Sequence, residues 1–158
     1  MQARGYRLFL VCAHLYTAYL AGLSGDTGTR QEALAAGWEI FTADGQHYLP
    51  LLPPAALSDV TVAGLRAGLP AESIGLVMRQ QLPDQAFELL RSMTDATDPA
   101  VRANVAQLLG DLGTAAAYPA LRALAKDRSN TVRQAADHAL ARIVYRPPYK
   151  LRVRTLGA

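Results

Sequence analysis

One helical pattern occurs twice in this chain, with the second copy 31 residues after the first. DPAVRANVAQLLGDLG begins at Asp98, and SNTVRQAADHALARI repeats its pattern from Ser129, so that Val101 aligns with Val132. In both copies the apolar residues fall at i, i+4, i+7, i+8 and i+11, which is one stripe along an α-helix. Because such a helix must bury its stripe against a neighbour, the repetition predicts that the copies pack together.

The segment between the copies predicts a second helix, from Ala115 to Lys126. Asp98 is expected to cap the first copy by accepting hydrogen bonds from free backbone N–H groups, and Gly113 is expected to end that copy. A further shift by 31 residues gives a third, degenerate copy, in which Ala86, Phe87, Leu90 and Met93 align with Ala117, Tyr118, Leu121 and Leu124. A helix pair of this size cannot bury its own stripe, and about three copies are needed for a stable stack.

The pattern D-P-x-V-R-x-x-V-A-x-L-L-G-x-L-G, followed by x-x-A-x-P-A-L-x-x-L, resembles the short HEAT-like repeats of bilin-lyase-type and other armadillo-type proteins. The resemblance covers about Asp84 to Ile143. It implies an all-α fold, a short right-handed helical solenoid, and a role for the Val-Arg arginine in joining neighbouring repeats. Arg102 and Arg133 match that arginine, and Asp95, Asp98 and Asp127 are the expected carboxylate partners.

Three segments are predicted: an N-terminal helical cap with a Pro-rich loop (residues 1–57), the helical repeats (58–145) and a basic tail (146–158). In the first segment, the capping box Thr29–Glu32 predicts a helix from Arg30 to Thr42. A further helix is expected after Ser58, beyond the prolines. The helices expected over Leu8–Leu23 and Arg30–Thr42 would cover the open end of the stack.

The apolar run from Leu8 to Leu23 superficially resembles a signal peptide. Its 16 residues fall short of the roughly 20 that a bilayer requires, and it contains His14 and Thr17. We therefore expect a buried helix of a soluble protein, with no membrane partner. The single cysteine, Cys12, excludes an internal disulfide and favours the cytoplasm. Whether the chain forms a homodimer through this apolar helix stays open.

Positive charge is concentrated at the C-terminal end. Residues 1–121 contain seven Arg against eleven Asp or Glu, whereas residues 122–158 contain nine Lys or Arg against two Asp. Such a basic end suits an acidic protein surface, nucleic acid or solvent. If the second helix of each repeat lines the concave side, as the resemblance implies, a protein partner would meet the basic residues of these helices and of the tail. They are Arg91, Arg122, Lys126, Arg146, Lys150, Arg152 and Arg154.

An alternative function is DNA binding, because Val60 to Arg79 resembles a helix-turn-helix. Its second helix would contact DNA through Ser73, Arg79 and Gln80. The early turns of that helix offer Glu72 and no cation for phosphate, which weakens this hypothesis.

Catalysis is not expected, because the sequence lacks the usual ingredients. His14, His47 and His138 are scattered and have no metal-ligand spacing, and there is no phosphate-binding loop or G-x-S-x-G motif. No cofactor is expected. We therefore predict a non-catalytic adaptor or regulatory module of a bacterial-type cytoplasm, with a lyase-like or chaperone-like helper for a pigment-bearing partner as a weaker alternative.

Overall fold

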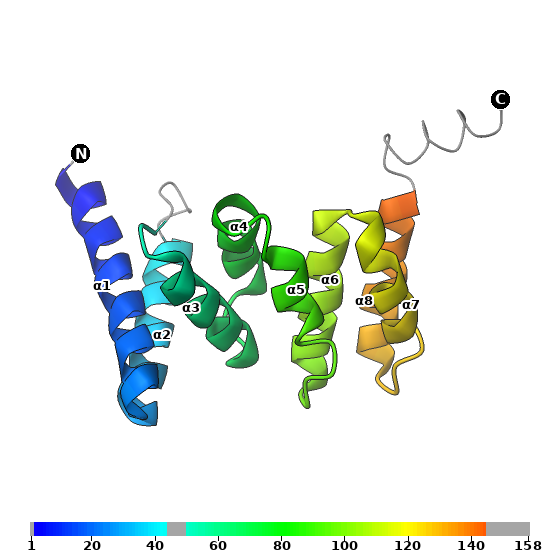
Figure 1. Cartoon of the computed structure of the whole chain (residues 1–158), viewed down its shortest axis with the longest axis horizontal. Helices are drawn as coiled ribbons and strands as arrows, with labels where there is room; N and C mark the ends of the chain where they lie inside the picture. Colours follow the sequence, from blue (N-terminus) through cyan, green and yellow to red (C-terminus); the bar gives the residue numbers. More distant parts are fainter. Residues whose placement is uncertain (1, 44–49, 145–158) are drawn as a thin grey trace. The chain divides into compact units, whose positions relative to one another are not determined.

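The structure is a computed structural model that describes residues 2–43 and 50–144, and the side chains of residues 6–43 and 50–143. Over these residues the chain forms eight α-helices and one short 3₁₀-helix, with no strand (Figure 1). It divides into two compact units, residues 1–86 and 87–158. The predicted segment boundary at residue 57 remains a prediction.

Unit 1 begins with a helical hairpin of α1 (Gln2–Ser24) and α2 (Thr27–Ala43). Gly25 ends α1 in the left-handed region, at φ 79°, where a side chain would be strained. The carboxylate of Asp26 then accepts hydrogen bonds from the Thr29 N–H at 3.1 Å and from the Thr29 hydroxyl at 2.7 Å. The expected cap at Thr29 was therefore wrong, because Asp26 satisfies the free N–H groups one turn earlier.

The second hairpin of unit 1 consists of α3 (Pro54–Arg66) and α4 (Ala71–Gln81). The expectation that α3 begins after Ser58 was wrong. Pro54 starts the helix, because proline lacks an N–H and suits the first helical position.

The two hairpins of unit 1 share a core. The indole N–H of the buried Trp38 donates to the Val60 carbonyl at 3.2 Å, which joins α2 to α3. Arg30 of α2 donates to both carboxylate oxygens of Asp59 in α3, at 2.8 and 3.0 Å, and to the Ala18 carbonyl of α1 at 3.1 Å. One guanidinium therefore connects three helices.

Helix α1 is buried on one side only, which corrects the expectation of a buried helix. Val11, Leu15, Ala18 and Ala21 are buried on the side that packs against α2 and α3. The opposite side is exposed and apolar. Among the described residues, Tyr6–Ser24 is the one helical stretch long and apolar enough to cross a membrane by length and composition, a test that the core helix of a soluble protein also passes.

Helix α5 (Ala86–Arg91) begins at the last residue of unit 1, and unit 2 continues with α6 (Pro99–Leu112), the 3₁₀-helix η1 (Ala115–Ala117), α7 (Tyr118–Leu124) and α8 (Asn130–Val144). Helices α6 and α8, the two copies of the repeated pattern, run side by side with the shorter α7 packed on both (Figure 1). As predicted, the Asp98 carboxylate caps α6 by accepting from the Ala100 N–H at 2.9 Å, and Gly113 ends it at φ 63°.

A close approach between small residues joins α6 to α8. A Cβ atom placed on Gly110 would lie 2.7 Å from the Cβ of Ala139 and 3.0 Å from its Cα. The predicted stripes are buried at this contact, with Val101, Leu109 and Val132 at most 1% exposed. Leu140, which aligns with Leu109, is half-buried.

Candidate protein-interaction surface

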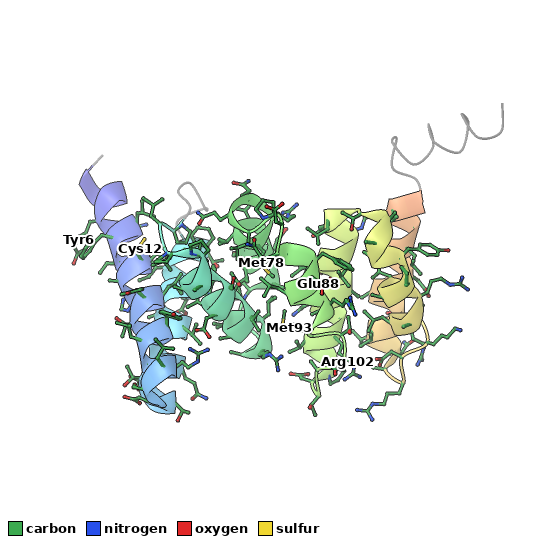
Figure 2. All side chains as sticks on the ribbon, viewed as in Figure 1. Tyr6, Cys12, Met78, Glu88, Met93 and Arg102 are labelled. Atoms are coloured by element: carbon green, nitrogen blue, oxygen red, sulfur yellow. The ribbon has the colours of Figure 1, made fainter. Side chains whose placement is uncertain are left out.

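The arginine of the Val-Arg motif in the first copy joins two helices of unit 2. Arg102, labelled in Figure 2, donates through Nε and Nη2 to the two carboxylate oxygens of Asp127 at 2.9 and 3.0 Å, and through Nη1 to the carbonyls of Ala96 and Thr97. Asp127 also accepts from the Ser129 N–H at the start of α8. The guanidinium of α6 is thereby attached to the turn that leads into α8.

This ion pair is shielded, with the Arg102 side chain 6% and the Asp127 side chain 12% exposed. The hydrogen bonds from Arg102, with that from the Ser129 N–H, lower the pKa of the Asp127 carboxyl. The same carboxylate raises the pKa of Arg102. Of the expected carboxylate partners, Asp127 is the one that binds Arg102, while Asp98 caps α6.

Within the described residues, Arg133, the arginine of the second copy, donates to the start of its own helix and the turn before it. Its Nη1 donates to the Asp127 carbonyl at 2.7 Å, which matches the Arg102–Ala96 contact 31 residues earlier.

A shallow hollow of about 420 Å³ lies beside the Arg102–Asp127 pair. Arg102 already donates to Asp127 and to two carbonyls there, so its guanidinium serves the fold. No group of three or more His, Cys, Asp or Glu residues within 2–43 and 50–144 is arranged to hold a metal ion.

A second ion pair, which the sequence analysis missed, also joins α6 to α8. Arg142 donates to the Asp111 carboxylate and to the Gln107 carbonyl, the latter at 3.0 Å. Asp111 and Arg142 occupy the same position in the two copies, 31 residues apart. An inversion of charge at one repeat position was therefore the signal that could have identified the pair.

Two cations near the end of α7 differ from these in their surroundings: Arg122 belongs to the helix, and Lys126 lies in the turn that follows it. Arg122 and Lys126 are exposed, and neither makes an ion pair within the described part of unit 2. Leu121 and Leu124 are buried on the opposite side of the helix. We call the exposed residues Tyr118, Arg122 and Lys126 the basic α7 face.

Tyr118 is the aromatic neighbour of Arg122 on this face. The guanidinium carbon of Arg122 lies 5.9 Å from the centre of the Tyr118 ring, near the outer limit of a cation–π contact. Tyr118 is itself 39% exposed. A ring that restricts the arginine side chain reduces the entropy lost when a partner binds. Tyr and Arg are also residues that often dominate binding energy.

The remaining predicted partner-binding residues are less clearly placed for that role. Arg91 occupies the position of Arg122 in the preceding copy and is exposed, but it lies 3.5 Å from Glu88 on its own helix. The tail residues lie outside the described part of the chain: Arg146, Lys150, Arg152 and Arg154.

The residues of the DNA-binding alternative do not form one exposed surface. Ser73 is buried, and its hydroxyl oxygen accepts from that of Thr42 at 2.9 Å, so it is unable to contact a base. Arg79 and Gln80 are exposed at the end of α4, while Glu72 is the exposed charge at its start. A carboxylate there repels phosphate, so the helix-turn-helix alternative is not favoured.

The comparison with protein families agrees with this geometry. Residues 71–143, a little under half of the chain, match the family model of HEAT repeats. Residues 71–143 of this chain form HEAT-like repeats. The predicted all-α, solenoid-like fold is confirmed, and HEAT repeats are commonly protein-interaction modules and generally not catalytic. No curated protein and no solved structure matches the chain significantly.

Proposed function

We propose that this HEAT-like protein is a non-catalytic adaptor or regulatory module of the cytoplasm. Its basic α7 face binds an acidic surface on another protein, with Arg91 and the basic residues of 146–158 extending the contact. The proposal rests on one observation: among the residues that the structure describes, Arg122 and Lys126 are exposed cations without a carboxylate partner, whereas Arg102 and Arg142 are held by Asp127 and Asp111.

The exposed charges predict that partner binding depends on salt. Exposed charges steer an oppositely charged partner and mainly affect the rate of association, so binding weakens as salt shortens the Debye length below about 10 Å. Because α7 packs through Leu121 and Leu124, its exposed side is available without any change in the helix. A preformed surface of this kind spares the cost of ordering a loop on binding.

The experiment compares proteins captured from a native cell extract by the immobilised full chain and by variants. Arg122→Glu with Lys126→Glu reverses both charges of the basic α7 face, and we expect specific partners to be depleted several-fold. Arg79→Glu, a charge reversal on the exposed end of α4, is the matched control and should retain them. Circular dichroism verifies that each variant is folded.

An identical set of proteins captured by the wild type and both variants would refute the basic α7 face as the binding site. Random duplex DNA provides the second arm of the test. If the chain bound such DNA with a steep dependence on salt, and Arg79→Glu weakened that binding, the nucleic-acid alternative would replace the proposal.

A further inference from the structure

The exposed side of α1 carries an apolar stripe with a regular spacing. Tyr6, Phe9, Ala13, Tyr16, Leu20 and Leu23 are separated by 3, 4, 3, 4 and 3 residues. This is the heptad spacing by which one α-helix packs along another. The large members of the stripe, together with the adjacent Leu51, are 41–79% exposed. Tyr6 projects from α1 on the side away from α2 (Figure 2).

The buried side of α1 is occupied by different residues. Val11, Leu15 and Ala18 pack toward α2 and α3, on the side of the helix opposite the stripe. The stripe is therefore not needed for the core of unit 1, and its spacing fits a second helical partner.

We infer that α1 pairs with α1 of a second copy of this chain, in antiparallel orientation about a two-fold axis. The stripe is symmetric about its midpoint, so an antiparallel pair places Tyr6 against Leu23, Phe9 against Leu20 and Ala13 against Tyr16 of the second copy. A two-fold interface requires such self-complementarity, because the same surface is used by both partners. This inference does not depend on the basic α7 face.

The charge distribution favours protein over membrane as the occupant. In Tyr6–Ser24 the one formally charged side chain is Arg7, which lies outside the stripe. An antiparallel pair therefore buries no charge and brings no like charges together. A helix lying on an anionic membrane would carry Lys or Arg beside its apolar stripe, whereas here Leu10, Cys12 and Thr17 flank it.

A groove beside the stripe adds contact area near the proposed axis. Phe9, Cys12, Ala13 and Tyr16 of α1, with the segment Leu51–Pro53, enclose about 330 Å³. The Leu51 N–H donates to the Cys12 sulfur at 3.4 Å, which holds the segment next to α1. In the antiparallel pair, the ring of Tyr16 of the second copy lies opposite this groove.

The exposed area of the stripe sets the expected affinity of the dimer. The three aromatic and three leucine side chains offer roughly 500 Å² of exposed surface. Two such faces bury roughly 1,000 Å², the lower limit for a specific interface, before flanking residues are counted. We therefore expect a dimer that dissociates in the micromolar range.

The test is sedimentation equilibrium of the full chain from about 1 to 300 μM. The wild type should shift from monomer to dimer over this range. Phe9→Ser with Leu20→Ser should raise the dissociation constant by more than about tenfold without loss of helical content, since both side chains are exposed. Gln31→Ser with Glu39→Ser, two exposed changes on α2, should leave it unchanged.

Orientation is tested by cross-linking on a Cys12→Ser background. Proteins carrying Phe9→Cys and Leu20→Cys are mixed and oxidised, and the antiparallel pair predicts a disulfide between unlike copies. Like copies should not cross-link, because two residues at position 9 lie roughly 16 Å apart along the helix axis in that pair.

Three results would overturn the inference. They are a wild type that stays monomeric at 300 μM, a preference for cross-links between like copies, and a monomer that floats with phosphatidylcholine–phosphatidylserine vesicles. The last result would assign the stripe to a membrane surface.

Discussion

Gly110→Ala tests the contact between the two repeat copies. In an isolated helix this change stabilises by about 1 kcal/mol, because alanine has less backbone entropy to lose than glycine. In this structure the new methyl group would lie 2.7 Å from the Ala139 Cβ and 3.0 Å from its Cα. Both are rigid atoms of a neighbouring helix, so α6 and α8 must separate.

The gain in helix propensity and the steric clash oppose each other, and their sizes decide whether Gly110→Ala raises or lowers the free energy of unfolding. An extra methylene forced into a packed contact costs about 1–3 kcal/mol. The two carbon atoms would lie 2.7 Å apart, whereas the optimum is about 3.5–4.0 Å. The cost at this site is therefore expected in the upper part of the range of about 1–3 kcal/mol. We therefore expect Gly110→Ala to lower the free energy of unfolding by about 1–2 kcal/mol, even though its effect on the helix alone is favourable.

The repeat supplies a matched control. Ala141 occupies the position of Gly110 in the second copy and is exposed. Ala141→Gly should therefore lower the free energy of unfolding only through the weaker helix propensity of glycine, by about 1 kcal/mol. Combining Gly110→Ala with Ala139→Gly removes the methyl group that obstructs the first change. The double variant should therefore be more stable than the sum of the single changes predicts, by about 1 kcal/mol.

The assay is urea unfolding of the full chain, monitored in two ways. Far-UV circular dichroism follows the helices of both units, while fluorescence follows the single tryptophan, Trp38, in unit 1. The circular dichroism transition of Gly110→Ala should shift to lower urea. A midpoint equal to or above that of the wild type would refute the close packing of α6 on α8.

Two further changes test unit 2. Asp98→Ala removes the cap of α6 and should lower the free energy of unfolding by about 1 kcal/mol in urea titrations, whereas Asp95→Ala, a similar loss of charge on an exposed residue, should not. Asp127→Asn tests pH dependence: because the folded-state pKa of Asp127 is lowered, its contribution is complete above the ordinary carboxyl pKa of 3.8 and is lost as pH falls through the lower folded value. Stability of the wild type should therefore fall more steeply than that of Asp127→Asn between about pH 5 and 2, and parallel curves would contradict the role of this ion pair.

Much of the fold follows from local pattern. The 31-residue repeat, the cap at Asp98 and the end of α6 at Gly113 depend on residues within one helix or turn, and sequence spacing reports these directly. The cap at Asp26 shows the limit of this reasoning, since the capping box at Thr29 predicted a later helix start than the one observed. The backbone turn at Gly25 selected the earlier one.

The sequence by itself determined that helices of one repeating kind must pack together, because an apolar stripe with a 3.6-residue period has no stable place in water. Only the tertiary structure decided which charged side chains form ion pairs and which are exposed to solvent. Arg102 and Arg122 are both arginines on amphipathic helices, yet one meets Asp127 from 25 positions away and the other faces solvent. The difference arises because ion pairs and exposed faces depend on which helices become neighbours, and that is a property of packing rather than of local spacing.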